Sequence, residues 1–284
     1  GDNNYRRSGV LDAVRLPKDP WFVHQVMWDG WVNSDVPHTY IMGHWSYAAG
    51  VTKPIYVASN GDTVELFLNG KSLGKGERSS GFLFTFKDIA FAPGELKAVS
   101  TYADGRTSEY ALKTAGAPVA LRLTPHYGPR GLVADGNDLM LVDVEVIDAY
   151  GQRVPTAFNP VAFKLEGAAI WKGGIAQTEG PSEPKKDATN AVLATTLPVE
   201  LGVNRVLIRA TTKAGKVHLT ATAEGLKSAS LDTASHAIAV KDGLSTVFAE
   251  DYQPSDLSRG PTSLTPSYTP VLRAIPVATI TAGS

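Results

Sequence analysis

The sequence predicts a mainly β protein of two tandem antiparallel sandwiches with one helix before them. Three observations predict this class: runs of alternating apolar and polar residues, turn residues at regular intervals between the runs, and a break at residues 115–118 after which the pattern restarts. A period of two is typical of strands that bury one face. Short strands at this spacing favour β-sandwiches of the immunoglobulin-like type.

Residues 1–33 differ from the rest and predict a single helix. Asp19 is expected to cap it, and Pro20 suits a first helical position. In the run that follows, Trp21, Val23-His24 and Trp28 fall near the i, i+3, i+7 spacing of one apolar face. One such helix has no core of its own. We therefore expect it to pack on the first sandwich or on a domain outside this sequence.

The first predicted sandwich spans residues 34–115. Its clearest strand is Thr63–Leu68, in which apolar and polar side chains alternate, and Asn69-Gly70 supplies the positive φ angles of a tight primed turn. Glycine, asparagine and proline separate the strands, because the first two tolerate positive φ and proline presets a turn. The other strands are expected at residues 40–42, 54–58, 82–86, 95–103 and 107–113.

The second predicted sandwich spans residues 116–241. Its strands are expected at residues 119–124, 139–148, 161–165, 191–197, 204–211, 216–223 and 230–240. Between them, residues 177–190 are polar and rich in Gly, Pro, Ser and Lys, which predicts a loop. Residues 242–284 hold five of the 18 prolines and many Ser and Thr, so we expect an extended tail or a linker.

Composition excludes several classes of function. The net charge is −1 with both signs interspersed, which argues against nucleic acid and against a polybasic membrane anchor. The chain has no cysteine, so it has neither a disulfide framework nor a thiolate nucleophile or ligand. No apolar run approaches the roughly 18 residues of a membrane span. The sequence starts without methionine and without a signal peptide, and we expect a fragment or a processed piece.

No catalytic constellation is predicted within the chain. Glu65, Glu95, Asp143 and Glu145 do not converge as a pair of catalytic carboxylates would, and we expect them to be solvated or structural. The six histidines lack the spacing and clustering that a zinc site requires. Glycine loops that cradle phosphate are also missing. The sequence therefore predicts no metal site and no cofactor.

One aromatic cluster has two interpretations. It comprises Trp28, Trp31, Tyr40, His44, Trp45 and Tyr47, all within twenty residues. The first interpretation is a core that joins the helix to the first sandwich, because large aromatic side chains commonly fill such seams. The second is a sugar platform, in which His44 and Trp45 on a loop after a strand bind a pyranose by stacking and hydrogen bonding.

The order of segments resembles that of family 2 glycoside hydrolases, which include β-galactosidases and β-glucuronidases. Residues 9–28 are similar to the last helix of their catalytic (β/α)8 barrel. Residues 43–47, Gly-His-Trp-Ser-Tyr, are similar to the His-Trp-Asn-Trp loop that follows the barrel in many members. Residues 64–74 and 93–99 resemble the small immunoglobulin-like module that comes next.

The resemblance continues to about residue 240. Residues 134–136, 142–146 and 219–225 are similar to a bacterial immunoglobulin-like domain that follows in the family. The fold implied is therefore mainly β: tandem immunoglobulin-like β-sandwiches preceded by the terminal helix of a (β/α)8 barrel. Only the tail lies outside the resemblance.

The resemblance also implies a function. The chain is expected to be the C-terminal accessory region of a retaining exo-acting glycoside hydrolase, with β-galactosides as expected substrates and β-glucuronides as the alternative. Both catalytic glutamates would lie upstream, so no catalytic residue is carried over and the chain alone is expected to be inactive. His44 and Trp45 are the expected sugar-binding residues, although Ser46 replaces the usual asparagine beside them.

Partners and location follow from the same resemblance. The expected partner is an upstream barrel, in the same polypeptide or in a cleaved chain, and a homo-oligomer is a further option. A bacterial enzyme of the periplasm or exterior is expected, with the cytoplasm as the alternative. The competing class is a non-catalytic carbohydrate-binding or adhesion protein of tandem sandwiches. The first thirty residues discriminate, since a binding module would start at its own first strand.

Overall fold

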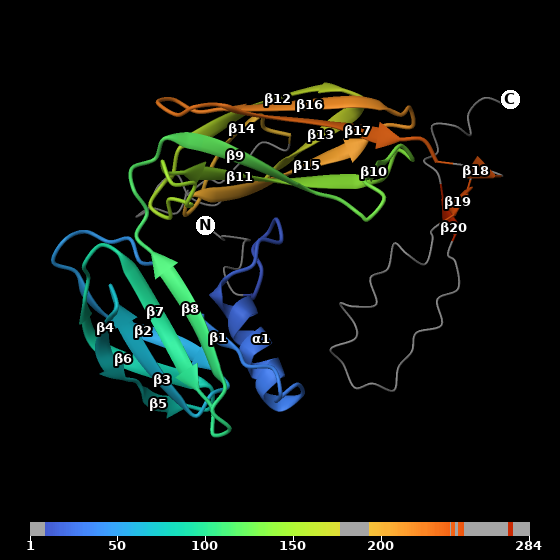
Figure 1. The fold of residues 1–284 in the computed structure, drawn as a ribbon. Helices are drawn as coiled ribbons and strands as arrows, with labels where there is room; N and C mark the ends of the chain where they lie inside the picture. The colour runs from blue at the N-terminus through green and yellow to red at the C-terminus, as the bar shows by residue number, and fades with distance from the viewer. Residues whose placement is uncertain (1–8, 177–192, 239, 242–243, 247–271, 275–284) are drawn as a thin grey trace, which may run out of the picture. The chain divides into compact units, whose positions relative to one another are not determined.

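The computed structural model describes residues 9–176, 193–238, 240–241, 244–246 and 272–274. These residues form the helix α1 (Asp19–Trp31) and otherwise strands, which confirms the mainly β class (Figure 1). The chain divides into two compact units, Gly1–Gly116 and Ala117–Ser284. The predicted loop at residues 177–190 lies outside the described residues.

The first unit holds α1 and a sandwich of two four-stranded sheets. Their strand orders are β1-β2-β6-β5 and β4-β3-β7-β8. The strands are β1 (Thr39–Ile41), β2 (Thr52–Ser59), β3 (Thr63–Leu68), β4 (Lys71–Lys75), β5 (Glu77–Ser80), β6 (Leu83–Ala90), β7 (Glu95–Thr101) and β8 (Thr107–Lys113).

The second unit is another pair of facing sheets, with orders β13-β15-β11-β9 and β10-β17-β16-β12-β14. The strands are β9 (Ala120–His126), β10 (Leu132–Val133), β11 (Leu139–Ile147), β12 (Pro160–Gly167), β13 (Ala169–Gly174), β14 (Thr196–Pro198), β15 (Val203–Ala210), β16 (Gly215–Thr222) and β17 (Ala229–His236).

A small third sheet contains β18 (Val240–Lys241), β19 (Leu244–Thr246) and β20 (Leu272–Ala274), paired in that order. Its last two strands fall within the predicted tail of residues 242–284 and pair antiparallel. Residues 244–246 and 272–274 are therefore extended strands of this sheet. The rest of the predicted tail lies outside the described residues.

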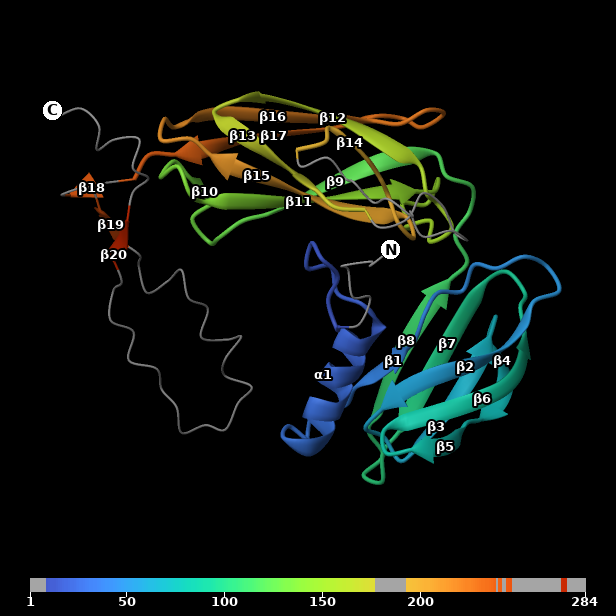
Figure 2. The ribbon, with the colours of Figure 1, turned by 180° about the vertical axis from the view of Figure 1, so that it is seen from behind.

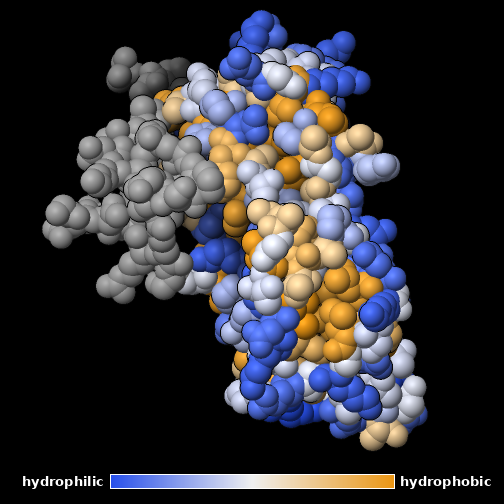
Figure 3. Space-filling model, turned by 90° about the vertical axis from the view of Figure 1, so that its left-hand side faces the viewer, coloured by the Kyte–Doolittle hydropathy of each residue, from blue (hydrophilic) through white to orange (hydrophobic). Residues whose placement is uncertain are grey.

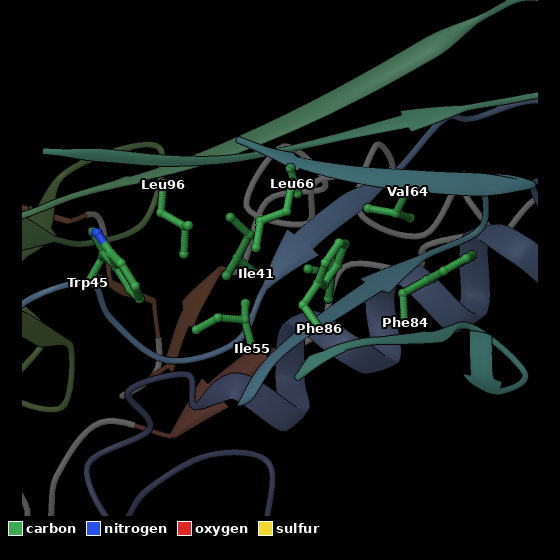
Figure 4. Packing of buried hydrophobic residues seen from close by; sticks show 10 residues of the cluster. Ile41, Trp45, Ile55, Val64, Leu66, Phe84, Phe86 and Leu96 are labelled. Carbon is green, nitrogen blue, oxygen red and sulfur yellow. The ribbon is translucent and has the colours of Figure 1, made fainter. Parts of the chain in front are cut away.

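The core of the first unit lies between its two sheets. Val64 and Leu66 on β3 are fully buried, and they face buried residues of the other sheet such as Phe84 and Phe86 (Figure 4). Alternation along each strand produces this arrangement, because every second side chain points to the same face. The strand pattern of the sequence therefore locates this core correctly.

The predicted strands of the first unit correspond to observed ones, but β4 and β5 were not predicted. Every residue of both strands is exposed. They lie at the edges of their sheets, and neither buries a face. A strand without a buried face carries no apolar alternation, so the pattern that reveals β3 is absent from β4 and β5.

The helix prediction is confirmed in type, but its cap was wrong and its packing face was correct only in part. Lys18 occupies the N-cap position, while Asp19 lies in the first turn and accepts a hydrogen bond from the Tyr40 hydroxyl at 2.7 Å. Val26 and Asp29 are the buried residues of the helix, whereas Trp21 and Trp28 are 39% and 48% exposed. Of the predicted face, Val23 packs against the cluster of Val26, Tyr40 and Ala58, while both tryptophans keep much of their surface exposed.

The helix α1 packs on the sandwich beside β1 and β2 (Figure 2). The Phe22 ring stacks on Tyr40 at 4.8 Å between centroids. Near the end of the helix, the Asp29 carboxylate is 2.7 Å from the Nδ1 atom of His38 and is 2% exposed. A buried carboxylate requires such a partner, since leaving it unpaired is costly. Asp29 therefore fixes the end of the helix to the segment before β1.

The Asn69-Gly70 turn has the positive φ angles predicted for it, 53° and 78°. The Asn69 side chain also accepts a hydrogen bond from the Glu95 backbone N–H and donates one to the Pro93 carbonyl, both at 2.9 Å. A Cβ on Gly94 would lie 1.8 Å from Asn69 Oδ1, so only glycine fits there. One asparagine therefore shapes its own turn and anchors the turn before β7.

Two substitutions of Asn69 separate the contribution of its positive φ angle from that of its side-chain hydrogen bonds. Asn69→Ala is expected to lower the free energy of unfolding by about 1–2 kcal/mol, because alanine disfavours positive φ and lacks the two hydrogen bonds. Asn69→Gly is expected to lower it by about half as much, since glycine accepts the backbone conformation. Urea denaturation of both variants measures the difference. Equal losses would contradict the backbone contribution.

Hydrophobic side chains also remain at the surface. On the face that Figure 3 shows, hydrophobic residues gather in patches among hydrophilic ones. Isolated exposed apolar residues are ordinary in soluble proteins. Along α1 the exposed aromatic side chains recur on one face, since Trp31 is 67% exposed in addition to Trp21 and Trp28.

Candidate functional site

The predicted site residues lie on the loop of residues 42–51, which joins β1 to β2. Gly43 and Gly50 have φ angles of 87° and 84°, in the left-handed region that favours glycine. In the middle, the buried Ser46 hydroxyl accepts a hydrogen bond from the Ala115 backbone N–H at 3.0 Å. Ser46, which replaces the asparagine of the family motif, thus attaches the loop to the end of the first unit.

Trp45 is a core residue of this unit, with 1% of its surface exposed. Its indole N–H donates a hydrogen bond to the Ala92 carbonyl at 3.0 Å, and its ring makes edge contacts with Phe91 at 5.2 Å and Tyr47 at 6.1 Å. Figure 4 shows the indole among the core side chains. A stacking platform needs an open indole face, and here the face is covered.

His44 lies at the surface of the same loop and is half-buried. Its ring stacks on Tyr47 at 4.4 Å with an angle of 26° between the planes. The Ser46 backbone N–H lies 3.2 Å from His44 Nδ1 and donates to it. An acceptor Nδ1 places the proton of the neutral imidazole on Nε2. His44 is therefore oriented, with one ring nitrogen as an N–H donor.

Two further residues of this site were not predicted as site residues. The Lys53 ammonium donates a hydrogen bond to the Tyr47 hydroxyl at 2.7 Å and lies 4.4 Å from the centre of that ring. The sequence contains a signal for Lys53, because it has the same strand phase as the buried Ile55 and Val57. A lysine on the inward phase at the end of a strand is a candidate for a specific partner.

The aromatic cluster of the sequence does not form one assembly. Tyr40 joins the helix to the sandwich through Phe22, as the core interpretation expected. Trp45 belongs instead to the core between the sheets. Trp31 contacts the Phe82 ring by its edge at 5.4 Å yet stays largely exposed. Burial within the cluster therefore differs from one ring to the next.

The carboxylates singled out in the sequence have structural partners. Asp143 pairs with Arg205 at 2.5 Å, and Glu145 pairs with Arg122 at 2.8 Å. Glu65 accepts a hydrogen bond from Ser72 at 2.5 Å, and Glu95 lies 3.7 Å from the ammonium of Lys113. These four side chains support the expected structural roles.

The part of the chain that the structure describes contains no group of three or more His, Cys, Asp or Glu side chains placed to hold a metal ion. Among the same residues, no helix combines the length and the apolar character needed to cross a bilayer.

Both units match known families. Residues 121–232 match the family described as glycoside hydrolase family 2 C-terminal domain 5, and residues 50–109 match a domain of unknown function, DUF4982. A β-glucuronidase of Formosa agariphila is 37% identical over 248 residues, which are 87% of this chain and 24% of that protein. The β-galactosidase BoGH2A of Bacteroides ovatus is 33% identical over 228 residues, 78% of this chain and 25% of its own.

Solved structures agree with these relatives. A β-glucuronidase from glycoside hydrolase family 2 superposes with a TM-score of 0.75 at 35% identity, covering 95% of this chain and 25% of its own. A family 2 member from Bacteroides cellulosilyticus gives a TM-score of 0.68 at 28% identity over 80% of this chain and 32% of its own.

The chain thus spans about a quarter of the length of the curated relatives it matches, and the match includes both of its units. This chain therefore belongs to glycoside hydrolase family 2, to the C-terminal part of its proteins.

Proposed function

We propose that this chain is the C-terminal accessory region of a retaining exo-acting β-glycosidase whose catalytic barrel precedes it. The observation that carries the proposal is the similarity of both units to one segment of proteins about four times as long, two of which are named β-glucuronidase and β-galactosidase. Tandem sandwiches alone would fit an adhesion protein equally well. The similarity to named glycosidases favours the enzyme.

The catalytic pair is proposed to lie outside this chain. A retaining glycosidase places two carboxyl groups about 5–5.5 Å apart, one as acid and one as nucleophile. Among the described residues, the candidate carboxylates that the sequence offered are tied to Arg205, Arg122, Ser72 and Lys113. A carboxylate that is committed to a structural partner is a poor nucleophile. We therefore propose that the isolated chain is inactive.

The exposed aromatic face of α1 supports an upstream partner. Trp21, Trp28 and Trp31 are 39%, 48% and 67% exposed, on a helix whose other face packs on the sandwich. Exposed aromatic stripes commonly mark interaction surfaces. We propose that the catalytic barrel covers this face, as it would if α1 were its last helix.

The loop of residues 42–51 is proposed to form part of the rim of the sugar site. His44 is the proposed contact, because it lies at the surface of the loop and its Nδ1 accepts from the Ser46 backbone N–H, which makes Nε2 the N–H donor of the neutral ring. Trp45 is predicted as the stacking partner of the sugar, but its ring is buried. We propose that it contributes indirectly, by supporting the ring of Tyr47. We retain β-galactosides as the proposed substrates. β-Glucuronides are the second candidate, favoured by the relative at 37% identity.

The bacterial relatives support a bacterial source, and we propose a periplasmic or secreted enzyme. The experiment compares the full-length enzyme with the 284-residue chain on chromogenic β-galactoside and β-glucuronide. Hydrolysis by the full-length enzyme alone is expected. Turnover by the isolated chain would refute the upstream location of the catalytic pair, and no turnover by either would favour the binding-protein class.

The proposed role of His44 has its own test. In the full-length enzyme, His44→Ala is expected to lower kcat/KM by roughly three- to tenfold, the value of one lost hydrogen bond. His218→Ala is the matched control, since His218 lies in the second unit, where its ring is 2.7 Å from the exposed Asp232 carboxylate and 3.1 Å from the Thr220 hydroxyl. Equal kinetics of the two variants would contradict the contact.

A further inference from the structure

Lys53, Tyr47 and His44 form a continuous series of contacts at the surface of the loop of residues 42–51. The Lys53 ammonium holds the Tyr47 hydroxyl at 2.7 Å, and the Tyr47 ring stacks on His44 at 4.4 Å. We propose that Lys53 is a positioning residue, which fixes Tyr47 and through it the imidazole of His44 for sugar binding. The proposal rests on the proposed function, because it requires that His44 contact the sugar.

Lys53 lies beside this loop, next to a bulge in the sheet. Lys53 opposes Ile89 on β6, but Ile55 opposes Phe86, so a single residue of β2 faces two of β6 at this point. One of those two, Asp88, has a φ angle of 53°. The extra residue is on β6, so the bulge bends β6. Lys53 is the second residue of β2, directly after the loop of residues 42–51, and from this position its ammonium reaches Tyr47.

The ammonium of Lys53 has an unusual partner. Among the described residues no carboxylate lies within ion-pair distance of it, and Tyr47 supplies both its hydrogen-bond acceptor and an aromatic face 4.4 Å away. Both interactions act on the same ring, one at its hydroxyl and one at its π face. Lys53 therefore restricts both the position of the Tyr47 hydroxyl and the tilt of the Tyr47 ring.

The remaining contacts of Tyr47 explain why the effect reaches His44. The edges of Trp45 and Phe91 meet the Tyr47 ring at 6.1 Å and 5.9 Å, with planes close to perpendicular. Both belong to the core or pack against it, so they provide a rigid base. Lys53 completes the support from the solvent side. His44 then stacks on a ring that cannot rotate away, which lowers the ordering cost of sugar binding.

The test uses the full-length enzyme. Lys53→Met keeps the aliphatic stem and removes the charge, and it is expected to raise KM about three- to tenfold with kcat within about twofold, because only the preorganisation of binding is lost. Lys53→Arg restores a cation and is expected to recover most of the affinity. Lys87→Met is the matched control, since Lys87 on the adjacent β6 pairs with Glu77 with both side chains largely exposed.

Tyr47→Phe provides an independent arm, because it keeps the stacking ring and removes only the acceptor of Lys53. The double variant of Lys53→Met with Tyr47→Phe is expected to raise KM less than the product of the two single effects. Unchanged KM in Lys53→Met, failure of Lys53→Arg to rescue, or multiplicative effects would each overturn the proposal. A fall in melting temperature with unchanged kinetics would assign Lys53 to stability alone.

The two proposals fail in different ways. If His44→Ala impairs the enzyme and Lys53→Met does not, the positioning role is wrong and the sugar contact stands. If neither variant changes the kinetics, the loop does not form part of the sugar site.

Discussion

Trp45→Ala is expected to lower the free energy of unfolding of this chain by about 3–5 kcal/mol, among the larger effects of a single core substitution. The side chain is 1% exposed and its indole N–H is bonded to the Ala92 carbonyl. Removal leaves a cavity between the two sheets, strips Phe91 and Tyr47 of their edge contacts, and leaves a carbonyl without its donor. Denaturation in urea, followed by circular dichroism, measures the loss.

Trp31→Ala is the matched control for this prediction. It removes the same side chain from a position that is 67% exposed, where only the edge contact with Phe82 is lost. A change below about 1 kcal/mol is expected. A Trp45 variant as stable as the Trp31 variant would contradict the buried placement. It would restore Trp45 as an open platform for a sugar.

Trp45 also shows what can be predicted from the sequence and what cannot. The cluster of aromatic residues at positions 28–47 includes both the buried Trp45 and the exposed Trp31, which look alike in the sequence. Which ring is buried depends on the position of the loop relative to β6 and β7, and on the Ser46 bond to Ala115. These contacts join residues far apart in the chain, so no local pattern reports them.

The sequence predicts a structural feature correctly where that feature depends only on neighbouring residues. The Asn69-Gly70 turn was predicted because its φ angles are a property of two residues. The packing face of α1 is a different case. Trp21 and Trp28 have helical spacing, but Val26 and Asp29 are the buried residues. Large apolar residues on two sides of a helix give no local criterion for which side a given neighbour covers.

The site shows the same limit. His44 was found because it belongs to a motif, whereas Lys53 and Tyr47 were missed as partners. Lys53 shares the inward phase of Ile55 and Val57, but its contact with Tyr47 depends on the path of the loop that joins β1 to β2. No local pattern in a single sequence reports the path of such a loop. Strand phase can nominate such a lysine, and only the three-dimensional structure identifies its partner.

Asp143→Ala is expected to lower the free energy of unfolding by about 2–4 kcal/mol, because it leaves the Arg205 guanidinium without its carboxylate. Asp143 and Arg205 are opposite each other on β11 and β15, with side chains 17% and 12% exposed. Two guanidinium nitrogens of Arg205 donate to the carboxylate at 2.5 Å and 3.1 Å. The ring of His126 contacts it at 2.9 Å from the neighbouring β9. Three strands thus converge on one carboxylate.

The pair of Lys164 and Glu166 in the same unit is the matched control, with side chains 72% and 52% exposed and a separation of 3.1 Å. Glu166→Ala is expected to change the free energy of unfolding by less than about 0.5 kcal/mol. Water screens the attraction between two exposed charges, and holding both side chains in place costs conformational entropy that offsets most of it. Denaturation of both variants at low and high salt measures the contrast. The Asp143 effect should persist at high salt, because partly buried charges are screened less than exposed ones. A loss for Asp143→Ala no larger than that for Glu166→Ala would show that the three strands are joined by their backbone ladders and buried valines, with no net contribution from the carboxylate.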